Sequence, residues 1–217
     1  MARFVLHTTD LSPFGQRAKL AFRCKGLMDQ LELVDTFGGT DALAALAPMA
    51  QIPLLETDGM ALPESQTIVD YLDILHPDPP LLPSHPKRAA LNRLVTRLVD
   101  LNIGPHFLTL ISAMRTPDQK DAIQSAVMAF YRGFGFVEHY FDQAELGTGD
   151  LQMADLALAP FAILAPHLAD WHGVPVFPDL PKMAGYLNTV QRAPHMAETF
   201  TEIETGYKAR ADRLRAT

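Results

Sequence analysis

The proline-rich segment HPDPPLLPSHP at residues 76–86 limits the folds open to this 217-residue chain. Five of its eleven residues are proline, which lacks the backbone N–H that helices and sheets need. The segment can neither continue a helix nor join a sheet, so we interpret it as a connection between two domains. The sequence thus predicts a first domain over 1–77, a linker over 78–86 and a second domain over 87–217.

The two predicted domains differ in their hydrophobic patterns. The first alternates short apolar runs with helical stripes, and its Asp58-Gly59 pair is a strong hairpin signal. The second shows helical patterns throughout. Strands are expected at 4–6, 31–35, 53–55 and 60–62, and helices at 13–26, 41–47, 65–75, 87–114, 117–145, 151–168, 180–192 and 195–214. The pattern predicts an α/β domain of order β-α-β-α-β-β-α followed by an all-α helical domain.

Composition argues against several classes of function. The net charge is −7, of which residues 1–79 carry −6, and no cluster of basic residues suggests a nucleic-acid partner. The longest apolar stretch, LALAPFAILAP, has about half the ~20 residues of a membrane helix and contains two prolines. We therefore expect neither nucleic acid nor a membrane as a partner.

Cysteine and histidine usage points away from disulfides and metals. Cys24 is the only cysteine, so the chain can form no internal disulfide and has no CxxC motif. His167 and His172 are five residues apart rather than the four that place two ligands on one helix face. The N-terminal apolar run is too short for a secretory signal. We expect a cytoplasmic protein without a metal site.

Ser12 precedes Pro13 at the start of a predicted helix. It is suited to cap that helix, which is the simpler interpretation. A hydroxyl at a helix N-terminus can also donate to an anion, and if that anion is a thiolate the pKa of the thiol falls from about 8.5 toward neutrality. The residues leave both interpretations open.

The segment QIPLLETDGMALPESQTIVDYL at residues 51–72 contains the second pair of candidates. Pro53 can simply begin a strand, but a cis Ile52-Pro53 bond would turn the backbone of Ile52 outward to pair with an extended peptide. Ser65 is expected to cap the following helix, with Glu64 beside it. The same helix end could instead hold the carboxylate and ammonium of an amino-acid head group.

Three segments of the sequence together resemble the cytosolic glutathione S-transferases. They are SPFGQRAKLAFRCKGL (12–27), APMAQIPLLETDGMALPESQTIVDYL (47–72) and DLQMADLALAPFAIL (150–164), and the likeness extends over essentially the whole chain. The resemblance implies a thioredoxin-like first domain, a helical second domain, glutathione as co-substrate and a homodimer. The residue types at the matching positions suggest a serine-type, bacterial-like member.

The resemblance also assigns roles to individual residues. Ser12 matches the serine that activates the thiol, and Asp155 the aspartate of a capping box that here begins with Gln152. The residues matching the family's glutathione site are Gln51, Ile52, Pro53, Glu64 and Ser65. From helix placement, we expect Phe14, His106 and Leu110 to form an apolar pocket for the second substrate.

One departure from the family pattern affects the expected affinity. Family members often hold the glycyl carboxylate of glutathione with a cation near residue 51, but residues 36–51 contain no Lys, Arg or His. We therefore expect weaker glutathione binding than is typical. Three functions remain open: a transferase that adds glutathione to small hydrophobic electrophiles, a glutathione-dependent isomerase or reductase, and a non-catalytic binding or scaffold protein.

Overall fold

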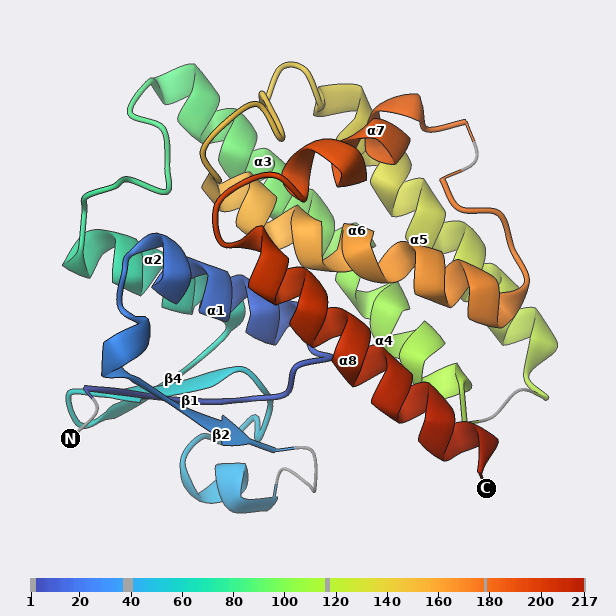
Figure 1. The fold of residues 1–217 in the computed structure, drawn as a ribbon, viewed down its shortest axis with the longest axis horizontal. Helices are drawn as coiled ribbons and strands as arrows, with labels where there is room; N and C mark the ends of the chain where they lie inside the picture. The colour runs from blue at the N-terminus through green and yellow to red at the C-terminus, as the bar shows by residue number, and fades with distance from the viewer. Residues whose placement is uncertain (1–2, 37–40, 116–117, 178, 217) are drawn as a thin grey trace.

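The structure, a computed structural model, describes residues 3–36, 41–115, 118–177 and 179–216. A four-stranded sheet with helices against it, drawn from blue to cyan, lies beside a larger group of helices drawn from green to red (Figure 1). This arrangement confirms the predicted fold class. The domain limits at 77 and 87 stay a prediction.

The sheet has the order β2-β1-β3-β4. Its strands are β1 (Phe4–Thr8), β2 (Leu31–Asp35), β3 (Leu54–Thr57) and β4 (Met60–Pro63). Strands β1 and β2 run parallel, since helix α1 (Pro13–Cys24) provides the crossover that parallel pairing requires. The remaining neighbours pair antiparallel, and β3 turns into β4 at Asp58 and Gly59, whose φ angles are 48° and 78°. Two positive φ angles are what a two-residue hairpin needs, so the predicted hairpin is confirmed.

The two faces of the sheet are covered by different elements. Because side chains alternate along a strand, Leu55 joins the main core beneath α1 and α2 (Ser65–Leu75), while its neighbour Leu54 packs against Leu43 on the other face. That second face is covered by η2 (Asp41–Ala45), a short 3-10 helix where the sequence predicted an ordinary helix. Another 3-10 turn, η1 (Met28–Gln30), leads into β2.

The helical part differs from the prediction at its first helix. The expected single helix over 87–114 is two helices, because Pro105 follows Gly104 and has no N–H to continue the ladder. The N–H of Ile103 closes the first helix on Val99, and the next helix begins at Gly104. The bounds are α3 (Pro86–Asn102), α4 (Gly104–Ala113), α5 (Lys120–Tyr140), α6 (Met153–His172), α7 (Pro181–Val190) and α8 (Met196–Arg215).

Helix α6 is the central element of the helical part. It spans 20 residues and is apolar enough to cross a membrane, yet 83% of its most apolar window is buried inside the protein. The helix is longer than the apolar stretch LALAPFAILAP, because it begins before that stretch and continues beyond Pro166. Its burial is that of a core helix.

The N-terminus of α6 is capped by more than its own residues. The backbone N–H of Gln152 donates to Asp155 Oδ2 at 3.1 Å, which is the aspartate half of the expected capping box. Asn92 of α3 accepts from the Ala154 N–H at 3.1 Å and donates to Gln152 Oε1 at 2.9 Å. A side chain from another helix thus supports the cap at Gln152.

Candidate active site

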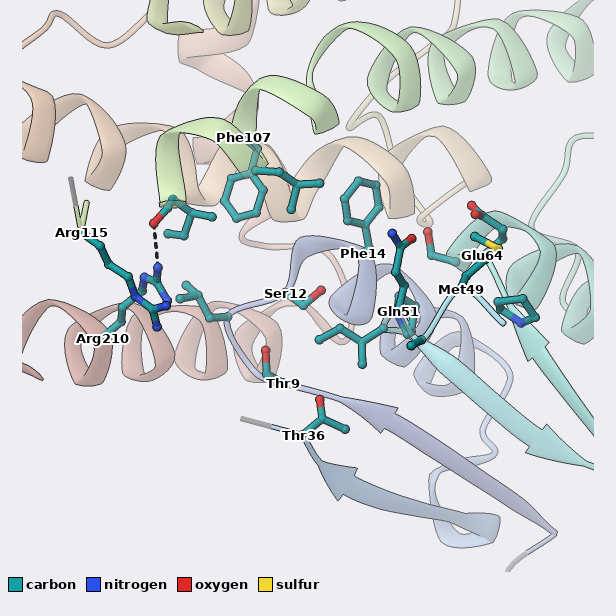
Figure 2. Close-up of a pocket in the computed structure, with 18 residues that line it drawn as sticks. Thr9, Ser12, Phe14, Thr36, Met49, Gln51, Glu64, Phe107, Arg115 and Arg210 are labelled. Carbon is teal, nitrogen blue, oxygen red and sulfur yellow. Dashed lines mark hydrogen bonds between the residues drawn. The ribbon is translucent and has the colours of Figure 1, made fainter. Parts of the chain in front are cut away.

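A cavity of about 580 Å³ lies between the two parts of the molecule (Figure 2). The start of α1, the segment before β3 and the start of α2 contribute one side, and α4 and α8 the other. The lining residues are Thr9, Leu11, Ser12, Phe14, Thr36, Met49, Ala50, Gln51, Ile52, Pro53, Pro63, Glu64, Ser65, Phe107, Leu108, Ile111, Arg115 and Arg210. The cavity therefore brings together Ser12, Phe14 and all five residues predicted to bind glutathione.

Ser12 is the N-cap of α1 and lies half-buried at the cavity wall. Its Oγ accepts the backbone N–H of Gly15 at 3.1 Å, so the capping interpretation is confirmed. Among the described residues no acceptor for its own O–H is found, and the first turn of α1 contains no acidic side chain. Capping and donation to an anion are thus compatible, since one uses the lone pair and the other the proton.

The Ile52-Pro53 peptide bond is cis, and both residues line the cavity. Strand β3 begins only at Leu54, and Ile52 takes part in no backbone hydrogen bond within the described parts of the chain. Its backbone polar groups are therefore free to pair with a ligand in an extended conformation.

The start of α2 differs from the expected cap. Glu64, not Ser65, is the N-cap, and it makes no side-chain capping bond. Its φ of 72° is unfavourable for a residue with a side chain and costs roughly 1–3 kcal/mol. Ser65 is the first helical residue and is buried. The N–H groups of this helix end are left to face the cavity, where the positive end of the helix dipole favours an anion.

Helix α4 presents different residues to the cavity than the sequence suggested. Phe107, Leu108 and Ile111 line it, whereas His106 and Leu110 do not. Leu110 is 1% exposed and belongs to the core, because the packing of α4 on its neighbours turns that face inward. The pocket assignment of His106 and Leu110 therefore does not match the geometry.

Phe14 does lie where it was expected. The Phe14 ring packs edge-on against Phe161 of α6 with a centroid distance of 5.2 Å. The ring of Phe107 also packs edge-on against Phe161, with a centroid distance of 5.6 Å. Phe14 and Phe107 line the cavity, whereas Phe161 is fully buried behind them, so two aromatic rings form part of the cavity wall. Such a wall suits the apolar body of a second substrate.

Two arginines that no sequence motif predicted also line the cavity. Arg210 of α8 donates from Nη2 to the carbonyl of Ile111 at 2.7 Å, and Arg115 follows the end of α4 (Figure 2). Burial, the charge of Arg115 and the charge of Arg213 all lower the pKa of Arg210. No local sequence pattern predicts that Arg210 lies beside the end of α4, since Arg210 and its partner Ile111 are 99 positions apart.

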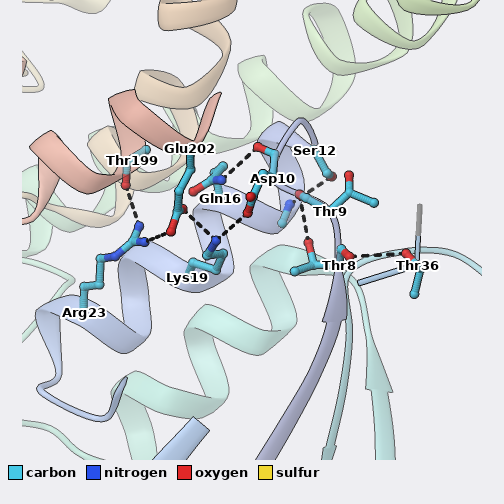
Figure 3. Close-up of polar contacts among 11 residues, drawn as sticks. Thr8, Thr9, Asp10, Ser12, Gln16, Lys19, Arg23, Thr36, Thr199 and Glu202 are labelled. Atoms are coloured by element: carbon cyan, nitrogen blue, oxygen red, sulfur yellow. Dashed lines mark hydrogen bonds and ion pairs between the residues drawn. The ribbon is translucent and has the colours of Figure 1, made fainter. Parts of the chain in front are cut away.

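A network of ion pairs fixes the loop that carries Ser12 (Figure 3). Lys19 Nζ lies 2.9 Å from Asp10 Oδ1 and 2.6 Å from Glu202 Oε2 of α8, and Gln16 Nε2 donates to the Asp10 carbonyl at 2.9 Å. Arg23 binds the other oxygen of Glu202 at 2.5 Å. The last helix of the chain is thus held directly against the element that positions the candidate hydroxyl.

The remaining titratable candidates lie away from this chemistry. Burial raises the pKa of the Cys24 thiol to about 11, and Cys24 borders a different cavity near the proline-rich segment. Within the described ranges no group of three or more His, Cys, Asp or Glu side chains is placed to hold a metal ion.

Comparison with known proteins agrees with this geometry. Residues 6–80 match the family model of the glutathione S-transferase N-terminal domain. The chain is 30% identical over 165 residues to maleylacetoacetate isomerase of Mus musculus, covering 72% of this chain and 75% of that one. It is also 30% identical over 165 residues to glutathione S-transferase 1 of Dianthus caryophyllus, covering 71% and 74%.

Solved structures show the same fold at lower sequence identity. A rice glutathione transferase, solved in complex with glutathione, superposes with a TM-score of 0.79 at 24% identity, covering 99% of this chain and 97% of that one. A tau-class enzyme from mango superposes with a TM-score of 0.78 at 22% identity, with 98% of each chain covered. The match to the family model and to the two relatives of 30% identity shows that this chain belongs to the glutathione S-transferase family.

Proposed function

We propose that this protein binds glutathione in the cavity between its two parts, activates the thiol as thiolate and adds it to small hydrophobic electrophiles. One observation carries the proposal: two helix N-termini, each with a serine hydroxyl, open on the same cavity. One end suits the carboxylate of the γ-glutamyl group, and the other suits a thiolate.

In this proposal the tripeptide lies extended across the first domain. Ser65 and the start of α2 hold the γ-glutamyl carboxylate, and the carboxylate of Glu64 binds the ammonium. The backbone of Ile52 pairs with the cysteinyl residue, and the cis Pro53 beside it shapes the turn. Gln51, which is exposed at the cavity, donates to the glycyl carboxylate without a charge to assist it.

Ser12 then acts on the thiol of the bound glutathione. Its O–H, which has no other acceptor among the described residues, donates to the sulfur and stabilises the thiolate, while the thiol proton passes to solvent. A hydrogen bond to a charged group is worth roughly 1.5–3 kcal/mol, which corresponds to a fall of about 1–2 in the pKa of the thiol. The thiolate forms a C–S bond with an electrophile held against Phe14 and Phe107. The displaced electron pair leaves with the leaving group or, in an addition to a double bond, passes to the neighbouring carbon, which solvent protonates.

A second function, glutathione-dependent isomerisation, is favoured by the maleylacetoacetate isomerases of mouse and rat among the relatives at 30% identity. The same site would serve it. The thiolate adds to one carbon of a double bond, the resulting single bond rotates, and the thiolate leaves again, so that glutathione is regenerated. A homodimer and a cytoplasmic location are likewise proposals, supported by membership of the family.

The test begins with calorimetric titration of glutathione, followed by the ultraviolet absorbance of the bound thiolate against pH. Ser12→Ala is expected to raise the pKa of the bound thiol by about 1–2. Thr9→Val, which removes another hydroxyl at the cavity, is the matched control and leaves that pKa unchanged. No binding at millimolar glutathione would reject the enzyme and favour a non-catalytic scaffold, and an unchanged pKa in Ser12→Ala would remove Ser12 from this role.

A further inference from the structure

The charged residues around the cavity are segregated. Of the described residues that line it, only Glu64, Arg115 and Arg210 carry charge. The acid stands at the start of α2, and the two arginines stand together at the far end, beyond Ser12 (Figure 2). This positive end is unexpected in a protein of net charge −7.

The arginine pair has no anion to balance it in the described part of the chain, where neither residue forms an ion pair with an Asp or Glu. Arg210 is half-buried, and its Nε is buried with no hydrogen-bond partner among those residues. Two like charges brought together in a partly desolvated place repel each other unless an anion lies between them. The pair is therefore arranged as a receptor for a negatively charged group.

On the side formed by α4, the surface between the arginines and Ser12 is apolar. Phe107, Leu108 and Ile111 of α4 line this stretch, and the bond from Arg210 to the Ile111 carbonyl fixes the guanidinium at its edge. A ligand that reaches from the thiol to the arginines must have an apolar body and an anionic end. A carboxylate matches the planar donor pattern of a guanidinium.

We propose that Arg115 and Arg210 form an anion subsite that selects acceptor substrates carrying a carboxylate on an apolar body. The inference rests on the proposed function, and it narrows the second substrate from any hydrophobic electrophile to an anionic one. The competing source of a carboxylate is the glycyl end of glutathione itself. Gln51 and Glu64, two of the residues proposed to hold glutathione, lie on the opposite side of Ser12 from the arginine pair (Figure 2).

The test compares 4-chloro-3,5-dinitrobenzoate with its methyl ester as acceptors for glutathione. Arg115→Gln and Arg210→Gln are each expected to raise KM for the carboxylate about 10-fold or more. They should leave KM for the ester and for glutathione within about twofold. Arg115 is exposed, so its variant is expected to fold even where loss of the Arg210 bond to Ile111 perturbs α8. Lys208→Gln removes the same charge from an exposed site on α8 outside the cavity and is the matched control.

Each result separates the inference from the proposed function. Equal changes in KM for the acid and the ester would overturn the proposed subsite. A rise in KM for glutathione would show instead that the arginines bind its glycyl carboxylate. If neither acceptor is turned over, the proposed function fails for this class of substrate. The subsite is then judged by calorimetry with S-(4-carboxybenzyl)glutathione and S-benzylglutathione. Tighter binding of the carboxylated conjugate, lost in Arg115→Gln, supports the subsite, whereas equal affinity or no binding of either overturns it.

Discussion

Lys19 and Glu202 form an ion pair of 2.6 Å that joins the first helix of the chain to its last. Lys19 is 1% exposed, and its ammonium also binds Asp10, two residues before Ser12. Glu202 completes the network by binding Arg23 through its other oxygen. The carboxylate on α8 therefore balances two buried cations of the first domain, and it holds the helix that carries Arg210 next to the loop that carries Ser12.

Glu202→Gln is expected to destabilise the protein by about 3 kcal/mol, because it leaves Lys19 and Arg23 without their shared carboxylate. Burial alone would raise the pKa of Glu202, but hydrogen bonds and charge from Arg23 and Lys19 hold it below its usual value. The stabilisation is therefore present above the pKa of the unfolded chain and is lost as the pH falls through the lower folded value. Urea unfolding at neutral pH measures the loss.

Glu204→Gln is the matched control for Glu202. Glu204 lies on the same helix and pairs with His167 at 2.8 Å, but its side chain is 55% exposed. An exposed pair contributes at most about 1 kcal/mol. Equal losses of unfolding free energy in Glu202→Gln and Glu204→Gln would show that the buried network stabilises the protein no more than an exposed ion pair.

Gly15→Ala should be destabilising by about 1–3 kcal/mol through overpacking. A Cβ at residue 15 would lie 1.9 Å from Thr8 Oγ1 and 3.3 Å from the Cβ of Ser12, so α1 must shift away from β1. Since the N-cap moves with the helix, the pKa of the glutathione thiol is expected to rise as well. Thermal unfolding and the absorbance of the thiolate report the two effects.

The second variant for Gly15 combines Gly15→Ala with Thr8→Ala, which removes the clashing oxygen. The double variant is expected to lose less unfolding free energy than the sum of the losses in the two single variants. Gly185→Ala, placed in α7 where no atom lies within 4 Å, should be neutral or slightly stabilising. Additive losses without recovery would show that the contact with Thr8 is not the cause.

Asp155→Asn is expected to destabilise the protein by about 2 kcal/mol or more at neutral pH. The carboxylate accepts from the N–H groups of Gln152 and Gly147 and from the hydroxyl of Tyr186, all at 3.0–3.1 Å. An Asn side chain has one acceptor oxygen, so its NH₂ group would face a donor. Chemical unfolding at pH 7 measures the difference.

The pH dependence of this difference has a defined sign. Burial raises the pKa of Asp155 from 3.8 to about 6, against the opposing hydrogen bonds. Between about pH 4 and 6 the folded protein binds a proton that the unfolded chain releases, so the contribution of Asp155 to stability grows as the pH falls. The difference in unfolding free energy between wild type and Asp155→Asn should therefore increase by up to about 3 kcal/mol from pH 7 to pH 4. A difference in stability that does not change with pH would contradict the raised pKa of Asp155.

Ser65→Ala tests the glutathione end of the cavity. Loss of a hydrogen bond to the γ-glutamyl carboxylate should weaken glutathione binding about 10-fold or more, while kcat at saturating glutathione stays near the wild-type value. Thr67→Ala removes an exposed hydroxyl from the same helix and should leave the affinity unchanged. Calorimetry measures both, and equal affinities for wild type and Ser65→Ala would remove Ser65 from the binding site.

The features that could be predicted from the sequence are those that depend on local chemistry. The prolines of 76–86 separated the strand-containing part from the helical part, since proline removes backbone donors. Asp58-Gly59 predicted the hairpin, because that turn needs two positive φ angles. Ser12, Ile52 and Glu64-Ser65 could be picked out because each lies at a helix start or strand entry that is visible in the sequence.

Which side chains face the cavity depends instead on how the helices pack together. The sequence placed His106 and Leu110 there, but packing turns α4 so that Phe107, Leu108 and Ile111 line it instead. Helical periodicity fixes which residues share a face but not the partner that each face meets. Residues from distant segments, such as Arg115 with Arg210 or Lys19 with Glu202, come together only when α8 docks on α1 and α4. Their chemistry therefore depends on the docked helices, which no local pattern in the sequence specifies.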